Sequence, residues 1–230
     1  VFAKAVEFVR SGRIGELISV HVGVPVKRTG VCPVACDLPE EPMEPGLDWD
    51  RWLGPAPSRP YNTVLSPRGV HTNYPDWRLY REYSGGMITD FGAHHFDIAQ
   101  WGLDADTSGP VEVLPPLREG SAFGARLIYP SGVQVIHGGP GGIIFTGSSG
   151  WIHVDRGLLK ASDEKIRSDQ PKDSDLHLPR PKGHHADWLD AIRTRRRPVC
   201  DVEVGARSVA CCHLVNLVYA QRNRSACIRI

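Results

Sequence analysis

The chain has 230 residues, of which 41% are hydrophobic and 23% are charged, and both fractions are ordinary for a soluble globular protein. This length can form one large domain or two small ones. The formal net charge of +1 gives no strong field toward nucleic acid or anionic lipid. No apolar run approaches the roughly 20 residues that a membrane-spanning helix needs. We therefore expect no nucleic-acid partner and no membrane partner.

The cysteines argue against a disulfide scaffold and against a structural metal. Cys211 and Cys212 are adjacent within a helical pattern, so they cannot easily pair with each other. Cys32 and Cys36 lack the second pair that a zinc site needs. We expect all six cysteines to be reduced thiols and expect no metal. No signal-peptide pattern opens the chain, and we expect a cytoplasmic location.

The first third of the chain alternates regular and irregular segments. Residues 2–11 have the apolar spacing of a helix, which Gly12 ends. Residues 17–24 alternate as a half-buried strand does, and Pro25 ends this strand. Residues 27–75 form a long Pro-rich loop, and loops of this length are usually functional or disordered. Four aromatic residues indicate that the loop is ordered: Trp49, Trp52, Tyr61 and Tyr74.

Beyond residue 110 the pattern changes to short strands and then to helices. A polar, proline-broken loop is expected at residues 168–183, and closing helices at residues 185–194 and 202–222. The order of elements predicts an α+β fold with a large, mostly antiparallel β-sheet and helices packed on one face. Its later strands are expected at residues 111–114, 122–129, 133–137, 142–146, 151–154 and 158–161.

Residues 85–101 have the spacing of one helix with a polar stripe beside an apolar face. At about 100° per residue, a stripe roughly 60° wide holds Asp90, His94, Asp97 and Trp101. A carboxylate one turn from an imidazole suits proton transfer, because it can fix the imidazole tautomer and because histidine titrates near neutrality. The pattern also fits an amphipathic helix whose polar side chains face water. Spacing alone leaves both interpretations open.

Three other motifs have simpler explanations. Residues 138–142 are glycine-rich, but a strand pattern follows them instead of the helix that a dinucleotide-binding loop requires. We therefore expect a hairpin or a close backbone approach there. The arginines within residues 193–197 suit the C-terminal end of a helix better than nucleic acid. The histidine pairs at 94–95 and 184–185 raise the possibility of a metal, but neighbouring residues on a helix point about 100° apart.

The segment Gly85-Gly86-x-x-x-Asp90-x-Gly92-x-His94-x-x-Asp97 resembles the catalytic helix of the Gfo/Idh/MocA oxidoreductases, the glucose-fructose oxidoreductase and inositol dehydrogenase family. Three other segments agree with this resemblance. Residues 47–57 are similar to a loop of a large bacterial subgroup, residues 185–193 with Arg197-Pro198 to its late helix, and residues 2–15 to the family's entry into its second domain. The resemblance covers nearly the whole chain, although residues 223–230 depart from the family's usual ending.

The resemblance implies an oxidoreductase with NAD or NADP as cofactor and a sugar or polyol as substrate. His94 would be the catalytic acid/base that exchanges a proton with a substrate hydroxyl. Asp90 would orient both the substrate and His94. Further residues would bind the substrate or, in the alternative interpretation, make ordinary surface and packing contacts: Asp97, Trp77, Arg78, Arg81, Tyr83 and His185.

Family members begin with a Rossmann domain of roughly 120–150 residues, which carries the glycine fingerprint and a Glu-Lys-Pro lysine. Neither motif is in this sequence. We therefore expect residues 1–230 to be a single substrate-binding and oligomerisation domain, with the dinucleotide-binding domain absent and no cofactor-binding residues. It would be inactive in hydride transfer by itself and would form homo-oligomers through its sheet. Two alternatives stay open: a non-catalytic carbohydrate-binding or assembly module, and a metal-dependent sugar lyase or hydrolase.

Overall fold

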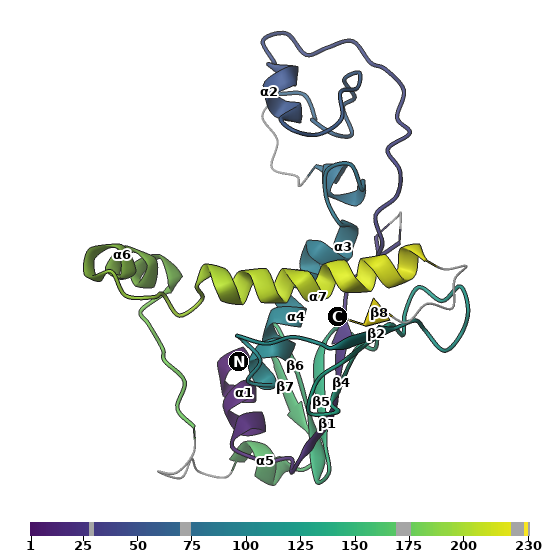
Figure 1. Cartoon of the computed structure of the whole chain (residues 1–230). Coiled ribbons are helices and arrows are strands. Elements are labelled where there is room, and N and C mark those ends of the chain that lie inside the picture. The colour runs from purple at the N-terminus through teal and green to yellow at the C-terminus, as the bar shows by residue number, and fades with distance from the viewer. Residues whose placement is uncertain (28–29, 70–74, 169–175, 222–227, 230) are drawn as a thin grey trace.

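The computed structural model describes residues 1–27, 30–69, 75–168, 176–221 and 228–229 (Figure 1). Its centre is an eight-stranded sheet in the order β7-β6-β5-β1-β4-β3-β2-β8. Of these neighbouring pairs, β1 with β4 is parallel and the others are antiparallel. The predicted α+β fold with a mostly antiparallel sheet is confirmed. The strands are β1 (Leu17–Gly23), β2 (Glu112–Leu114), β3 (Arg126–Ile128), β4 (Gln134–His137), β5 (Gly142–Gly147), β6 (Gly150–Asp155), β7 (Leu158–Ala161) and β8 (Ile228–Arg229).

Strand β1 occupies the middle of the sheet, between β4 and β5. Val20 and Val22 are fully buried, and His21 between them is only partly covered, as the alternation of a half-buried strand requires. The pairing of β1 with β5 shifts register between Leu17 and Ser19. Ile18, at this irregularity, is 55% exposed. The apolar alternation thus positions the strand's inner half, from Val20 onward, in the core.

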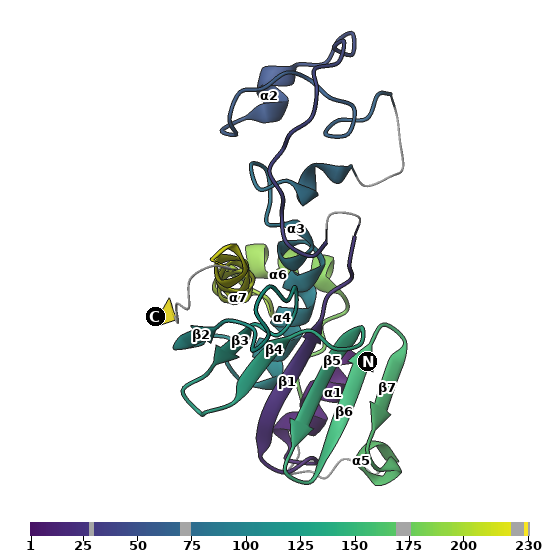
Figure 2. The same cartoon turned by 90° about the vertical axis from the view of Figure 1, so that its right-hand side faces the viewer.

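Three helices cover one face of the sheet: α1 (Phe2–Arg10), α4 (Phe91–Gly102) and α7 (Val202–Ala220) (Figure 2). The strand side chains on this face form the main core, and Leu127, Phe145 and Ile152 have no solvent exposure at all. Helix α5 (Glu164–Ser168) packs at the edge of the sheet by β7, and its buried Ile166 belongs to this same core. Among the described residues, no helix covers the opposite face of the sheet (Figure 2). None of the described helices is both long enough and apolar enough to cross a membrane.

A buried histidine joins α7 to the sheet. His137 on β4 has no solvent exposure, and its Nδ1 forms a hydrogen bond with the Tyr219 hydroxyl at 2.6 Å. The Tyr219 oxygen accepts in turn from the backbone N–H of Ala125 at 3.2 Å. Burial lowers the pKa of His137 to about 4, so this imidazole is neutral at pH 7. A short polar chain therefore connects α7 with two segments of the sheet inside the apolar core.

The described residues between Cys36 and Tyr83, which we call the arm, extend away from the sheet (Figure 1). The arm contains a helix, α2 (Trp49–Leu53), and a 3₁₀ turn, η1 (Asp76–Leu79). The Asp48 carboxylate begins α2 by accepting from the Arg51 N–H at 3.0 Å. The arm has a hydrophobic cluster of its own, formed by Trp49, Leu53, Tyr61, Leu65 and Tyr80.

Several boundaries differ from the sequence predictions. The loop predicted at residues 27–75 contains the short helix α2, and Tyr74 lies outside the described residues. The strand predicted at residues 122–129 is reduced to β3, because Gly124 adopts φ +101°, which interrupts an extended conformation. Helix α5 and strand β8 were not predicted, and residues 169–175 of the predicted polar loop lie outside the described residues.

Two helical glycines provide a test of the packing between α4 and the sheet. A Cβ added at Gly102 would lie 2.2 Å from Cε1 of the buried Phe145, whereas one added at Gly205 of α7 meets nothing within 4 Å. We expect Gly102→Ala to lower the free energy of unfolding by about 1–3 kcal/mol, because Phe145 must move. We expect Gly205→Ala to raise it by roughly 0.5–1 kcal/mol through helix propensity. Urea unfolding measures both, and equal effects of the two substitutions would contradict this packing.

Candidate active site

The helix predicted over residues 85–101 is broken at Asp90. The segment forms two helices, α3 (Gly86–Thr89) and α4, with Asp90 at φ −77° and ψ −82° between them. The prediction of one continuous helix is therefore wrong. Within α4, His94, Asp97 and Trp101 still lie on one side of the helix, as their spacing predicts. Asp90 is placed by the break and not by the helical period.

Contacts at Gly85, Gly86 and Thr89 fix α3 as a helix separate from α4. Gly86 has φ +69°, and a Cβ on it would lie 2.6 Å from the backbone nitrogen of Pro33. Thr89 accepts a hydrogen bond from the Gly85 N–H on its Oγ1 at 3.0 Å. The Asn216 amide of α7 donates to the Gly85 carbonyl oxygen at 2.7 Å. Contacts with the loop after β1 and with α7 thus fix the short α3 and set the angle at which α4 begins.

Asp90 and His94 both lie on the surface, at the start of α4. The Asp90 Oδ2 forms an ion pair with Arg78 Nε at 3.2 Å, so Asp90 connects α4 to η1 of the arm. The His94 imidazole is exposed and packs edge-on against the Phe91 ring, with centroids 6.0 Å apart. The described contacts place Asp90 against Arg78 and not against His94. The orientation of His94 by Asp90 stays a prediction.

Asp97 is the acidic residue of α4, and it contacts α7. It is partly covered, and its Oδ1 accepts a hydrogen bond from the Ser208 hydroxyl of α7 at 2.8 Å. Burial raises the pKa of the Asp97 carboxyl, while the Ser208 hydrogen bond and the nearby His94 imidazole act in the opposite direction. His94 therefore has an electrostatic partner one turn along the helix, Asp97, for which the family resemblance implied a role in substrate binding.

His95 is buried and joins α4 to β1. Its Nδ1 lies 2.6 Å from the Gly23 carbonyl oxygen at the end of β1, and its Nε2 lies 3.0 Å from Arg156 Nη1. Since guanidinium only donates, Nε2 accepts and Nδ1 donates, which is the neutral imidazole. Burial lowers the pKa of His95, and the Arg156 charge lowers it further, whereas the Gly23 bond opposes the shift. Arg156 also lies over the Phe91 ring at 4.3 Å.

The remaining residues with a predicted substrate-binding role are distributed over several places. Arg78 contacts Asp90, as described, and donates to the Pro75 carbonyl oxygen at 2.6 Å. Trp77 and Tyr83 line a cavity of about 540 Å³ inside the arm. Arg81 and Tyr83 line a larger open cavity of about 1170 Å³ between the base of the arm and α7. Among the described residues, neither cavity is lined by Asp90 or His94.

His185 lies on α6 (His184–Thr194), which is separated from the sheet in Figure 1. Its imidazole is exposed and packs against the His184 ring, with centroids 4.3 Å apart. The described contacts of His185 do not include Asp90 or His94. A substrate-binding role for His185 therefore stays a prediction without support from the geometry.

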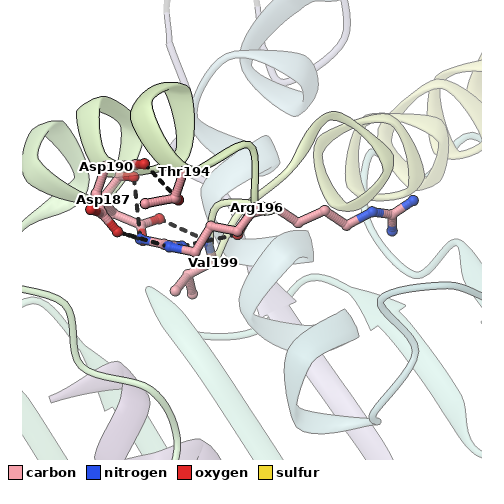
Figure 3. A network of polar contacts seen from close by, with 6 residues as sticks. Asp187, Asp190, Thr194, Arg196 and Val199 are labelled. Carbon is pink, nitrogen blue, oxygen red and sulfur yellow. Dashed lines mark hydrogen bonds and ion pairs between the residues drawn. The ribbon is translucent and has the colours of Figure 1, made fainter.

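An ion-pair network holds the C-terminal end of α6 (Figure 3). Arg196 donates to Asp187 Oδ1 at 2.7 Å and pairs with Asp190 Oδ2 at 2.9 Å. The other Asp187 oxygen accepts from the Val199 N–H at 2.7 Å. The Val199 N–H and the Arg196 guanidinium hold the pKa of the Asp187 carboxyl below its usual range. At least part of the basic cluster therefore has specific carboxylate partners, in addition to the helix dipole that the sequence suggested.

The chain shows no dinucleotide-binding loop among its described residues. Residues 138–142 connect β4 to β5 across β1, and no helix follows them. A Cβ on Gly23 would lie 1.9 Å from the Pro140 carbonyl oxygen, so this turn is a close backbone approach, as expected. The described residues also gather no group of three or more His, Cys, Asp or Glu side chains that could hold a metal ion.

Sequence reasoning missed two residues of the candidate site. Arg156 is 61 positions from its partner His95, and Ser208 is 111 positions from Asp97. Neither belongs to a motif, and only the packing of the β6–β7 turn and of α7 against α4 brings them to the site. No local pattern in the sequence would have identified them.

Replacing Arg156 tests the arrangement around α4. We expect Arg156→Gln to raise the pKa of His95, because the positive charge that favours the neutral imidazole is removed. NMR titration of the His95 ring measures this shift, and Arg193→Gln on α6 is the matched control, with no expected change at His95. An unchanged pKa of His95 in Arg156→Gln would show that the contact does not form in solution.

Comparison with known proteins gives a consistent result. A family model described as "Oxidoreductase family, C-terminal alpha/beta domain", GFO_IDH_MocA_C2, matches residues 8–227. No curated protein sequence matches the chain. Three solved structures share its fold at low sequence identity. They are the aldose-aldose oxidoreductase from Caulobacter crescentus complexed with glycerol (16% identity, TM-score 0.54), the WlbA dehydrogenase from Bordetella pertussis in complex with NADH and UDP-GlcNAcA (14%, 0.55) and a putative oxidoreductase from Thermotoga maritima (14%, 0.54).

The structural alignments include nearly all of this chain but only part of each neighbouring protein. The alignments with the Caulobacter and Bordetella proteins include 100% of this chain and 60% of each of those proteins. The alignment with the Thermotoga protein includes 98% of this chain and 59% of that protein. The chain therefore spans about 60% of the length of these solved proteins. Because the family model matches almost the whole sequence, the chain belongs to the Gfo/Idh/MocA oxidoreductase family and carries its C-terminal α/β domain.

Proposed function

We propose that this chain supplies the substrate-binding and acid–base part of an NAD(P)-dependent oxidoreductase that acts on a sugar or polyol. The observation that carries the proposal is the exposed His94 at the start of α4, with Asp97 one turn away and Asp90 held by Arg78. An exposed imidazole can meet a substrate hydroxyl, and a histidine titrates near neutral pH. The membership of the family supports the reaction class.

Each residue of the site has a part in the proposed proton transfer. His94 takes the proton from the hydroxyl whose carbon is oxidised, and returns it in the reverse direction. Asp97, fixed by Ser208, lies close enough to influence the charge on His94. The carboxylate of Asp90, fixed by Arg78, accepts hydrogen bonds from other substrate hydroxyls. His95, bonded to Gly23 and Arg156, holds the helix turn that presents His94.

The cofactor would be NAD or NADP, bound by residues other than those described here. The described residues fit no dinucleotide, so the 230-residue chain is proposed to be inactive in hydride transfer by itself. The titles of two neighbours support the substrate and cofactor classes, since one protein is complexed with glycerol and the other with NADH and a nucleotide sugar. A cytoplasmic location belongs to the same proposal, because Cys36, Cys200, Cys211 and Cys212 are thiols that form no disulfide.

Dehydrogenase assays test the proposed function. We expect the purified chain to form no reduced nicotinamide from sugars or polyols with NAD or NADP. Joined to the dinucleotide-binding region of a structural neighbour, it should gain turnover, and His94→Ala should lower kcat by roughly a hundredfold or more. His177→Ala, which removes an exposed histidine outside the site, is the control. Turnover by the chain alone would overturn the proposed inactivity, and full activity of His94→Ala would overturn the role of His94.

We also propose that the open face of the sheet joins copies of this chain. In the register of the strands, this face presents half-covered apolar side chains, including Ile136 and Ile144, and the 39% exposed Trp151. The same face also carries polar side chains such as His21, Thr146 and His153, and a mixed face of this kind without a covering helix is suited to a protein–protein contact. Its partner would be the same face of a second copy.

Light scattering tests the proposed sheet contact. We expect the purified chain to be dimeric or larger, and we expect Trp151→Glu to shift it toward monomer, because a carboxylate would be desolvated in the contact. Trp188→Glu on α6 changes a tryptophan that is 59% exposed elsewhere, and it should leave the oligomeric state unchanged. A monomeric parent chain would contradict the proposed contact.

A further inference from the structure

The arm contains a cavity to which the proposed proton transfer gives no role. Its volume is about 540 Å³, within the range of roughly 300–1,000 Å³ that is usual for small-molecule sites. The cavity opens between α2 and η1, two elements that the arm's own hydrophobic cluster holds together. Its walls include Trp52, Leu53, Ala56, Trp77, Glu82 and Tyr83.

The aromatic wall of this cavity is preorganised. The Trp52 ring stacks on Trp49, with centroids 4.5 Å and planes 16° apart. Tyr83 makes a T-shaped contact with Trp52, with ring centroids 5.6 Å apart. Trp49 is itself buried, and its Nε1 donates to the Arg59 carbonyl oxygen at 2.8 Å. Trp49 covers one face of Trp52, and Trp52 also lines the cavity. The ring therefore needs little reordering to receive a ligand.

The polar side of the cavity is a fixed carboxylate. Glu82 Oε2 accepts a hydrogen bond from the Cys36 N–H at 3.0 Å, and Oε1 lies 3.7 Å from Arg81 Nε. A carboxylate offers about four acceptor positions, so Glu82 can accept further bonds from ligand hydroxyls. The prolines at 55 and 57, which also line the cavity, stiffen its rim.

The charges around the cavity exclude two classes of ligand. The Arg59 guanidinium donates to the Cys36 and Leu38 carbonyl oxygens and acts on Tyr83 electrostatically, so a positive charge already lies at this end. This charge and that of Arg81 disfavour a cationic guest, and the Glu82 carboxylate disfavours an anionic one. A neutral ligand with one apolar face and several hydroxyls satisfies both the aromatic wall and the carboxylate.

We propose that the arm cavity binds one neutral pyranose ring, with its apolar C–H face against Trp52 and a hydroxyl donating to Glu82. This subsite goes beyond the proposed function, because it needs neither hydride transfer nor His94. Its position is linked to the candidate active site through η1, where Trp77 lines the cavity and the next residue, Arg78, pairs with Asp90. A sugar bound in the arm would thus lie on the same turn that fixes the Asp90 carboxylate.

Titration of the purified chain with methyl glucopyranoside tests the subsite. We expect saturable binding in the millimolar range, seen by tryptophan fluorescence and by ligand-observed NMR. Trp52→Ala should weaken binding by about tenfold or more, and Glu82→Gln by several-fold, because the carboxylate accepts more strongly than an amide. Trp188→Ala, which removes an exposed tryptophan from α6, should leave the affinity unchanged. Absence of saturation up to ~100 mM would overturn the proposal.

A second variant covers the case in which Trp52→Ala disturbs the arm. Ala56→Phe fills the cavity and keeps Trp49, Trp52 and Tyr83, so near-ultraviolet circular dichroism should be preserved while binding is lost. Retained binding in Ala56→Phe would overturn the proposal, as would stronger binding of tetramethylammonium than of the sugar. His94→Ala should not change sugar binding in the arm. Loss of binding in His94→Ala alone would instead assign the sugar to the candidate active site.

Discussion

The hydrogen bond between His95 Nδ1 and the Gly23 carbonyl oxygen determines how the candidate active site is presented. It joins α4 to the end of β1, the central strand of the sheet, at 2.6 Å. Because neighbouring residues on a helix point about 100° apart, burial of His95 on this strand turns His94 toward the surface. Arg156 completes the arrangement by donating to the other ring nitrogen. A neutral, buried imidazole thus positions an exposed one.

The other contacts of α4 assign each carboxylate to a different part of the fold. Asp97 lies one turn beyond His94 and is held by Ser208 of α7. Asp90 precedes α4 and is held by Arg78 of the arm. The sheet, the long C-terminal helix and the arm therefore meet at one short helix. A shift in any of them would change the distances between His94 and its neighbouring carboxylates.

The sequence predicted those helices and strands that are long enough to show a regular spacing of apolar residues. Helix α1, strand β1 and the closing helices follow the expected spacing, and the α+β class came from their order. The break at Asp90 was not predictable, because it depends on the close approach of Gly86 to Pro33. The five-residue helix α2 is too short for a periodic signal, although Asp48 provides its cap. The roles of Arg156 and Ser208 depend on packing between distant segments and have no local signal.

The exposure of Asp90 and His94 is physically consistent with a site that needs a second surface. Hydride and proton transfer proceed best where water is excluded, since a low local dielectric strengthens the interactions that stabilise the transition state. In this chain both side chains face solvent, and the sheet, α7 and the arm cover only their inner side. The solved neighbours, of which this chain spans about 60%, contain additional protein that can provide such a surface. In the function proposed above, the exposed His94 on a rigid helix forms the substrate side of a cleft that a dinucleotide-bearing surface closes.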